Sequence, residues 1–325
     1  MAKLALAIHG GAGTILRSAM TPELESEYRG GLETALQTGW AILESGGSSL
    51  DAVEAAVVSL EDFPLFNAGR GSVFTHEGKN EMDAAIMDGA SLRAGAVAFV
   101  RNVKNPVKLA RLVMERTEHI LLAGVGADQF AHEMGVEMAD DAYFFTEHRY
   151  EQLLRAREEG VVQLDHTAEE AEIIDESEIA HEPKQGIFAN KPIGTVGAVA
   201  CDSQGRLAAS TSTGGMTNKK FGRVGDTPII GAGNYADDRV AVSCTGHGEY
   251  FMLGVTAFDV AARMKYKGLS LEEASSETVS RLTEIGGEGG LIAVDTEGNL
   301  VLPFNSEGMY RGWITSLGSS VEIYR

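Results

Sequence analysis

The stretch that decides the fold is Gly194-Thr195-Val196-Gly197-Ala198-Val199-Ala200, an apolar run that opens with a glycine and a threonine. Its small and β-branched residues predict a buried strand, in which a threonine is ordinarily no more than a strand residue. A cut before Thr195 would nevertheless leave an α-amine and a hydroxyl on one residue. Because an α-amine with a pKa of about 7.7–8.0 can accept the hydroxyl proton, this pair is a complete nucleophile–base unit. Gly194 leaves the peptide to be cut uncrowded.

The residues before this stretch form an acidic segment. Residues 158–182 contain no Lys or Arg, whereas Asp and Glu cluster at Glu169-Glu170 and Asp175-Glu176. Charge repulsion and the scarcity of large apolar residues predict a mobile, exposed linker over about 158–190. Composition alone favours a tolerated surface insertion, but a linker that ends close to Gly194–Thr195 also suits a cleavage site.

The composition is typical of a soluble globular protein, with 44% hydrophobic residues among 325. The 47 acidic residues against 27 basic ones give a net charge of −20, which argues against nucleic-acid and membrane partners. Two cysteines, Cys201 and Cys244, exclude a disulfide framework and a four-thiolate zinc site. The apolar residues 4–8 are too few for a secretory signal, and no run approaches the ~20 residues that cross a bilayer. We therefore expect a cytoplasmic protein.

Helices are expected in both halves of the chain, with a β-rich second half. Residues 4–8 predict a short buried strand that runs into a glycine-rich turn at 9–13. Thr21 and Ser48 are expected to be helix N-caps. Helices are expected over 22–46, 49–63, 105–116, 254–264 and 271–282, and strands over 73–75, 94–100, 195–202, 206–213, 240–245, 291–295 and 300–303.

Two later segments supply what a threonine nucleophile needs. In Thr211-Ser212-Thr213-Gly214-Gly215 the hydroxyls alternate, so Thr211 and Thr213 face one side of a strand and Ser212 the other. In Gly222-Arg223-Val224-Gly225-Asp226 a cation and an anion stand three residues apart. An amino-acid head group demands such a pair, because Arg forks onto a carboxylate and Asp accepts from an ammonium. A surface ion pair is the commoner meaning of these five residues taken alone.

A third segment, Thr245-Gly246-His247-Gly248-Glu249, follows a strand. It can offer a hydroxyl and an open backbone N–H to a developing oxyanion. His247 either serves this site or only separates two needed glycines. The glycines at 9–13 do not match a dinucleotide-binding fingerprint, because Leu16 stands where the third glycine belongs.

In this order the motifs closely resemble the plant-type asparaginase/isoaspartyl peptidase family of Ntn-hydrolases, and the resemblance covers essentially the whole chain. Its markers in the first half are Ile8-His9-Gly10-Gly11-Ala12-Gly13, Leu65-Phe66-Asn67-Ala68-Gly69, Met82-Asp83-Ala84, Met87-Asp88-Gly89 and Asn105-Pro106. The second half adds the strand at Gly194, the three segments above and Asn305-Ser306-Glu307-Gly308-Met309.

The resemblance implies an α/β fold, a four-layer αββα sandwich formed by one domain over residues 1–325. It further implies self-cleavage at Gly194–Thr195 into an α chain (1–194) and a β chain (195–325), assembled as a dimer of cleaved αβ units, a heterotetramer. The implied reaction is hydrolysis of isoaspartyl dipeptides and L-asparagine by two-step acyl transfer, which releases L-aspartate. The uncut precursor has the hydroxyl but not the amine base, so it is expected to be inactive on substrate.

The resemblance also assigns roles by position. Thr195 is the implied nucleophile, Thr213 orients it, Arg223 and Asp226 hold the substrate's α-carboxylate and α-ammonium, Thr245 and the N–H of Gly246 form the oxyanion hole, and Gly248 and Asn67 line the site. No organic cofactor is expected. A sodium ion is implied in the loop from Leu60 to Arg70, bound by the backbone carbonyls of Leu60, Glu61, Phe63, Phe66, Ala68 and Arg70.

Three alternatives compete with this interpretation. Glycosylasparaginase shares the Arg/Asp anchor, but it usually has Asp where Gly194 stands and Asn where Gly215 stands. Taspase-like cleavage of folded proteins is a more distant alternative. A non-enzymatic binding protein that keeps only the fold would remain uncut, so self-cleavage separates it from the enzymes.

Overall fold

The computed structural model describes residues 3–162 and 194–325. The α-helices are α1 (Pro22–Glu44), α2 (Ser49–Glu61), α3 (Pro106–Arg116), α4 (Gly124–Glu133), α5 (Asp141–Phe144), α6 (Glu147–Glu158), α7 (Gly248–Gly254), α8 (Thr256–Ala262) and α9 (Leu271–Glu284). The strands are β1 (Ala5–Gly13), β2 (Met82–Asp88), β3 (Arg93–Val100), β4 (Leu121–Ala123), β5 (Val196–Cys201), β6 (Leu207–Thr213), β7 (Asn234–Ala236), β8 (Val240–Gly246), β9 (Gly289–Asp295), β10 (Leu300–Val301), β11 (Gly308–Thr315) and β12 (Gly318–Tyr324). The linker expected over about 158–190 lies outside the described residues from position 163 onward.

The described strands form two sheets. The larger sheet has the order β12-β11-β1-β5-β6-β2-β3-β4, and the smaller has the order β10-β9-β8-β7. Neighbouring strands are antiparallel, except that β4 runs parallel to β3. Thr195 directly precedes β5, an inner strand between β1 and β6, so the candidate nucleophile opens a strand that is held on both sides.

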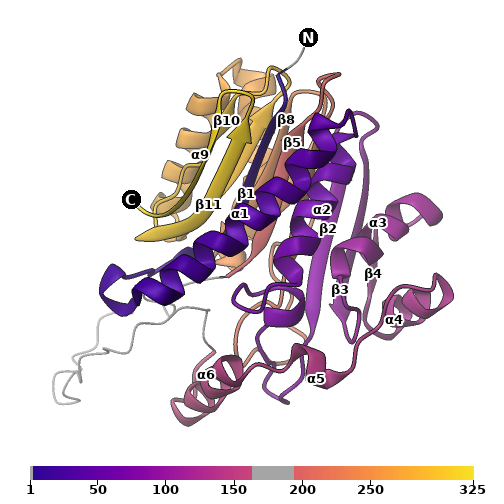
Figure 1. The fold of residues 1–325 in the computed structure, drawn as a ribbon, viewed down its shortest axis with the longest axis vertical. Helices are drawn as coiled ribbons and strands as arrows, with labels where there is room; N and C mark the ends of the chain where they lie inside the picture. The colour runs from indigo at the N-terminus through magenta and orange to yellow at the C-terminus, as the bar shows by residue number, and fades with distance from the viewer. Residues whose placement is uncertain (1–2, 163–193) are drawn as a thin grey trace.

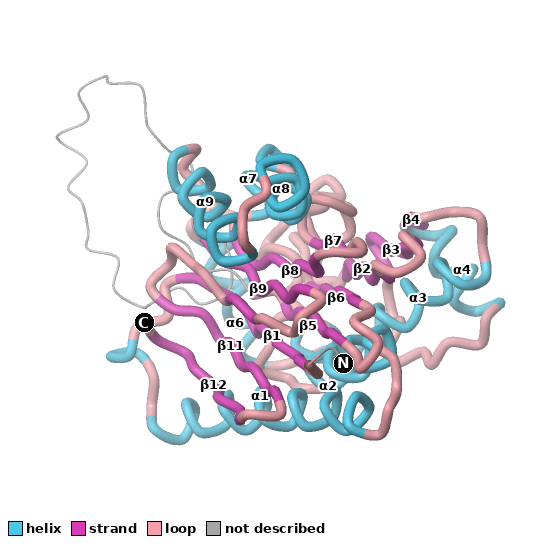
Figure 2. The backbone as a smooth tube through the Cα atoms, turned by 90° about the horizontal axis from the view of Figure 1, so that it is seen from above, coloured by secondary structure: helices cyan, strands magenta, loops and turns pink. Residues whose placement is uncertain are grey.

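The sheets and helices stack in layers (Figures 1 and 2). Helices α1, α2 and α3 cover one face of the larger sheet, the smaller sheet packs against its other face, and α8 and α9 cover the outside of the smaller sheet. Side chains of β5 alternate accordingly. Ala198 and Ala200 join the core under the helices, and Val199 and Cys201 join the core between the sheets. The expected α/β class is confirmed, and the layer order is consistent with the expected sandwich.

The glycine-rich turn expected at 9–13 is wrong, because these residues continue β1. The strand pairs with β11 as far as Gly13, and its register shifts between His9 and Gly11, which marks a bulge. A bulged strand still pairs on either side of the extra residue. Glycines that resemble a turn in sequence therefore lie inside the sheet, and the His9 side chain stays buried between the two sheets.

Several other expectations differ from the structure. The strand expected at 73–75 is reduced to isolated bridges, Phe74 with Asn80 and Thr75 with Lys219. The helix expected over 254–264 is interrupted at Val255, which has a left-handed φ of 47° between α7 and α8. Strands β2, β11 and β12 were not expected from the sequence. The caps at Thr21 and Ser48 are confirmed, since their side chains accept from Leu24 N and Asp51 N.

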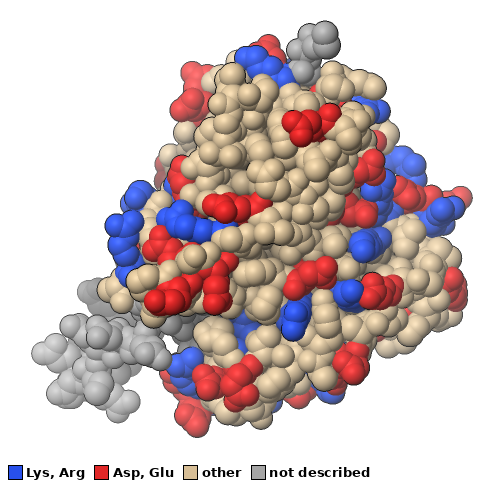
Figure 3. All heavy atoms as spheres, viewed as in Figure 1, with Lys and Arg blue, Asp and Glu red and all other residues tan. Residues whose placement is uncertain are grey.

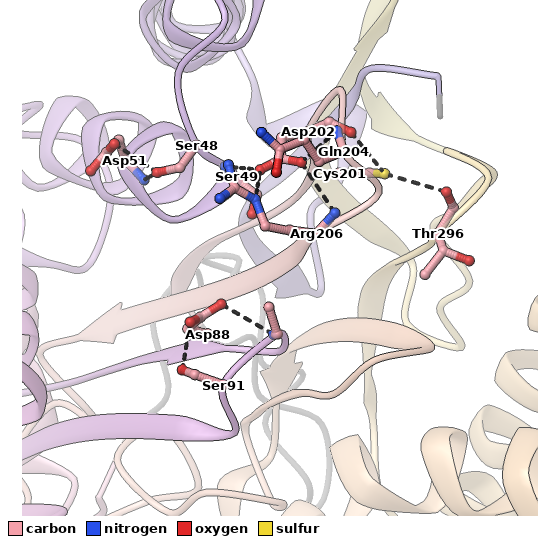
Figure 4. A network of polar contacts seen from close by, with 11 residues as sticks. Ser48, Ser49, Asp51, Asp88, Ser91, Cys201, Asp202, Gln204, Arg206 and Thr296 are labelled. Carbon is pink, nitrogen blue, oxygen red and sulfur yellow. Dashed lines mark hydrogen bonds and ion pairs between the residues drawn. The ribbon is translucent and has the colours of Figure 1, made fainter. Parts of the chain in front are cut away.

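The far end of β5 is anchored by Asp202, which is fully buried (Figure 4). Its carboxylate accepts from Gln204 N at 2.9 Å, from Arg206 N at 3.1 Å and from Arg206 Nε at 2.8 Å. It also accepts from Ser49 N at 3.3 Å, at the start of α2. One side chain thus closes the β5–β6 turn and ties it to the helical layer.

Charged side chains of both signs are distributed over the surface. On the face shown in Figure 3, acidic and basic side chains of the described residues are intermixed and form no broad basic area. No helix within residues 3–162 and 194–325 combines the length and apolar character that crossing a membrane requires.

Candidate active site

Thr195 and Thr213 are joined through their side chains beside the expected cleavage point. The Thr195 hydroxyl donates to Thr213 Oγ1 at 3.3 Å, and the Thr213 hydroxyl donates to the carbonyl oxygen of Gly194 at 3.1 Å. Gly215 N donates to Thr213 Oγ1 at 3.0 Å. The Thr213 hydroxyl therefore gives its one proton and accepts two, so its orientation is fixed. It in turn directs the Thr195 hydroxyl.

Asn67 holds the same peptide from the loop after α2. Its Nδ2 donates to the carbonyl oxygens of Gly194 and Gly215, both at 2.8 Å, and its Oδ1 accepts from Val73 N at 3.0 Å. The Gly194 carbonyl oxygen thus receives two donors, Asn67 and Thr213. Two donors aimed at one carbonyl can stabilise the negative charge that develops when a nucleophile attacks it.

Arg223 is held by a residue to which the sequence assigned no role. Its Nε and one terminal nitrogen donate to the two carboxylate oxygens of Glu249, both at 2.9 Å. Burial would raise the pKa of Glu249, but the hydrogen bonds and charge of Arg223 outweigh it and lower that pKa. This bidentate pair fixes the plane of the guanidinium. Donors on its other edge remain for a ligand.

Asp226 is a buried carboxylate whose Oδ2 accepts no hydrogen bond from the described residues. Burial raises the pKa of Asp226 to about 7, against the opposing charge of Arg223. A Cβ at position 248 would lie 2.8 Å from Asp226 Oδ1 and 2.9 Å from an Arg223 nitrogen, so a glycine is required there. An ammonium group would supply the donor that Asp226 Oδ2 lacks and add a second positive charge to that of Arg223.

The Thr245 hydroxyl lies at the end of β8, followed by Gly246. Its Oγ1 is buried and has no hydrogen-bond partner among the described residues. Gly246 lines a small pocket, with a cavity volume of about 10 Å³, together with Thr195, Thr213, Arg223 and Asp226. The residues predicted to be the nucleophile, its orienting threonine, the substrate's charged partners and one oxyanion donor therefore meet at one cavity. Asn67 and Gly248 do not line the pocket but lie next to residues that do, Gly215, Arg223 and Asp226, and Thr245 precedes Gly246 in β8.

Two further buried residues support this pocket and were missed as functional residues. Lys219 donates from Nζ to the carbonyl oxygens of Gly214 at 2.9 Å and Glu81 at 2.6 Å, which fixes the turn after β6. Burial lowers the pKa of Lys219, and the charge of Asp83 opposes that shift. His9 contacts the carbonyl oxygen of Thr195. Lysine in a glycine-rich loop resembles a solvated surface residue, so the sequence carried no signal for its burial.

His247 is the N-cap residue of α7 and is almost fully buried. Its ring packs edge-on against Tyr250, with centroids 4.9 Å apart, and its Nε2 lies 3.8 Å from a carboxylate oxygen of Glu249. Burial lowers the pKa of His247. The ring thus borders the Arg223–Glu249 pair, and it does not line the pocket.

The loop expected to bind sodium follows α2, the helix that packs against β5 and β6. Glu61 Oε1 accepts from Ser212 Oγ at 2.6 Å, on the face of β6 opposite Thr211 and Thr213, as the alternation predicted. The buried guanidinium of Arg149 donates to the carbonyls of Leu65 at 3.0 Å and Gly71 at 2.8 Å, neither of which is an expected ligand. The carbonyls of Phe66 and Ala68 each accept one N–H within the loop. A second lone pair remains on both, so each can accept a further contact, and sodium binding in this loop stays a prediction.

Comparison with known proteins agrees with the resemblance inferred from the motifs. The model of the asparaginase family matches residues 2–322. An isoaspartyl peptidase of Escherichia coli (strain K12) is 51% identical over 315 residues, which cover 96% of this chain and 93% of that protein. Isoaspartyl peptidase/L-asparaginases of Mus musculus and Xenopus laevis are 44% and 42% identical, each over 94% of this chain and over 86% and 91% of their own lengths.

Proposed function

Because the chain belongs to the asparaginase family and is an amidohydrolase of the isoaspartyl peptidase/L-asparaginase kind, we propose that Thr195 is its nucleophile and that the chain cuts itself at Gly194–Thr195. The observation that carries this proposal is the paired hydrogen bonding at the cleavage point. The Thr195 hydroxyl is oriented by Thr213, and the Gly194 carbonyl receives Asn67 and Thr213.

Self-cleavage begins with attack of the Thr195 oxygen on the Gly194 carbonyl carbon. The hydroxyl proton leaves along its hydrogen bond to Thr213, and Asn67 and Thr213 stabilise the oxyanion. Thr213 only relays that proton, which ends on the Thr195 nitrogen as the C–N bond breaks. The acyl group is then on the Thr195 oxygen, and the nitrogen is a free amine. Water then hydrolyses the ester, which yields a new carboxylate on Gly194 and restores the hydroxyl of Thr195.

The mature site uses the new amine as its base. The amine takes the hydroxyl proton while the Thr195 oxygen attacks the substrate's β-carbonyl carbon, and it returns that proton to the departing ammonia or amino acid. Thr245, whose hydroxyl lacks a partner among the described residues, and the N–H of Gly246 stabilise the oxyanion. Water then cleaves the β-aspartyl ester and releases L-aspartate.

Arg223 and Asp226 define the substrate class. Arg223 binds an α-carboxylate by the edge that Glu249 leaves open, and Asp226 binds the α-ammonium. L-Asparagine and β-aspartyl dipeptides share this head group and differ only in what leaves the β-carbonyl. The proposal therefore covers both substrates, with one anchor and one acyl-enzyme.

The proposal also includes assembly and a cation. The chains 1–194 and 195–325 are proposed to stay together as one domain and to pair as a dimer of cleaved units. The loop from Leu60 to Arg70 is proposed to hold sodium. Replacing sodium by choline at equal ionic strength should lower the melting temperature of the enzyme. An unchanged melting temperature would remove the cation from the proposal.

The acyl-enzyme provides the test. Acid-quenched reaction with L-asparagine should leave a β-aspartyl ester on Thr195, found by mass spectrometry of the N-terminal peptide of the β chain. Added hydroxylamine should divert the same intermediate to β-aspartyl hydroxamate, so a short-lived ester is still detected. Aspartate release with no ester and no hydroxamate, or an ester on another residue, would contradict the proposal.

A further inference from the structure

His9 belongs to β1, which pairs with β5, and its ring contacts Ser243 of β8 in the other sheet. Figure 2 shows these strands in their two sheets. The ring is completely buried. Its Nδ1 lies 2.9 Å from the carbonyl oxygen of Thr195, and its Nε2 lies 2.8 Å from Ser243 Oγ. Gly197 makes room for this contact, because a Cβ at that position would collide with both His9 and Ser243.

The hydrogen atoms in this network can be assigned from the chemistry of the partners. A carbonyl oxygen only accepts, so Nδ1 of His9 carries the hydrogen that it donates to Thr195. Burial lowers the pKa of His9 to about 3, so the ring is neutral and its Nε2 must accept. The Ser243 hydroxyl therefore donates to His9.

Beyond Ser243 the contacts lead farther from Thr195, and each donor still points back toward His9. Ser243 Oγ lies 2.7 Å from Thr211 Oγ1 and accepts from it, since Ser243 has already used its proton. The carbonyl oxygens of Ser210 and Gly233 lie farther away, 3.3 Å from Ser243 Oγ and 3.4 Å from Thr211 Oγ1, so the two shorter contacts take the hydroxyl hydrogens. Thr211 Oγ1 in turn accepts from Asn234 Nδ2 at 3.0 Å. Four uncharged groups from both sheets thus hold the histidine in one tautomer and one orientation.

We propose that His9 is the positioning residue of the nucleophile, which holds the carbonyl of Thr195 once cleavage has freed its nitrogen. This inference rests on the proposed function. Cleavage removes the covalent bond on one side of Thr195. Thr195 also precedes Val196, the first residue of β5 that pairs with β6, so the ladder between these two strands does not hold it. The histidine hydrogen bond then fixes the peptide that carries the amine and the hydroxyl, and a misplacement of about 1 Å costs up to about a hundredfold in rate.

Two substitutions distinguish the hydrogen bond made by Nδ1 of His9 from the one made by its Nε2. In His9→Asn the amide nitrogen can occupy the place of Nδ1 and donate to Thr195, but it loses Ser243. In His9→Gln the longer amide reaches Ser243 but leaves the Thr195 carbonyl without its donor. Activity is expressed per cleaved chain, from intact mass, so that a change in self-cleavage does not affect the comparison. Melting temperatures of both variants control for general loss of structure.

The Gln variant should lose about ten- to a hundredfold in kcat with KM nearly unchanged, and the Asn variant should keep kcat within a few-fold of the wild type. Equal losses in the two variants, or a change in KM alone, would overturn the positioning role. Cleaved, active Thr195→Ala protein would instead remove the proposed function and leave the histidine assignment standing.

The tautomer is measured independently of activity. In ¹⁵N-histidine NMR, the His9 signal is identified by its absence from the spectrum of His9→Asn. It should show the Nδ1–H tautomer, unchanged between about pH 5 and pH 9. An Nε2–H tautomer, or protonation within that range, would overturn the inference.

Discussion

Asn67 donates to the carbonyl oxygen of Gly194 over 2.8 Å, although the two residues are 127 positions apart in the chain. The same amide group also reaches Gly215, and Thr213 supplies the second donor to Gly194. The proposed self-cleavage would thus draw its oxyanion donors from the loop after α2 and from the end of β6.

Replacing Asn67 by Ala should slow self-cleavage about a hundred- to a thousandfold, because one of two oxyanion donors is lost. The uncut fraction is followed by intact mass after purification. Asn299→Ala, which changes an exposed asparagine in the β9–β10 turn, is the matched control and should mature normally. Normal maturation of Asn67→Ala would show that this hydrogen bond does not serve the cut.

Glu249→Gln tests the bidentate hydrogen bond that holds Arg223. The substitution keeps the shape but removes the charge and one acceptor, so the guanidinium loses its fixed plane. KM for L-asparagine should rise about tenfold while kcat changes less, because a bidentate charged hydrogen bond is worth about 1.5–3 kcal/mol. Steady-state kinetics measure both constants, with Glu272→Gln on α9 as the control. A lower KM would mean that Glu249 competes with substrate instead of orienting Arg223.

Asp226 makes ligand binding depend on pH. Its pKa is raised to about 7 in the empty site, chiefly by burial, and a bound ammonium lowers that pKa by favouring the ionised form. Binding below pH 7 must therefore release a proton, and affinity should increase as the pH rises toward 7 and level off above it. Calorimetric titration with L-aspartate at about pH 6, in buffers of different ionisation enthalpy, counts that proton. Binding without proton release at that pH would contradict the role of Asp226.

Asp202 is expected to affect stability without taking part in the reaction. Asp202→Ala leaves Ser49 N, Gln204 N and Arg206 without their acceptor, and should lower the free energy of unfolding by about 2–4 kcal/mol. Urea unfolding of the uncut Thr195→Ala chain measures this without interference from cleavage. A difference below about 1 kcal/mol would show that the turn does not depend on this carboxylate.

Local sequence signals predicted much of the fold. Thr21 and Ser48 marked helix starts because an N-cap bonds three residues ahead, within the same segment. The strand at β1 was cut short because glycines at a bulge resemble those of a turn. Strand β2 was missed since its Ala-rich sequence is buried along nearly all its length and lacks alternation.

In the candidate site, too, some contacts could be predicted from the sequence and others could not. Thr213 was predicted to orient Thr195, and the structure joins their hydroxyls. The partners of His9 lie 186 and 234 positions away, so no local pattern could indicate them. Glu249 stood within a recognised segment, but its pairing with Arg223 depends on how two loops meet. Such contacts follow from the tertiary fold, and the sequence alone does not specify them.

The central claim is that Thr195 cuts the chain before itself. It is tested most directly by the intact mass of freshly purified wild-type protein, followed over days beside Thr195→Ala. The account predicts two wild-type fragments that meet at Gly194/Thr195 and an unbroken variant chain. A wild-type chain that stays whole, or a variant that splits at the same peptide bond, would contradict it.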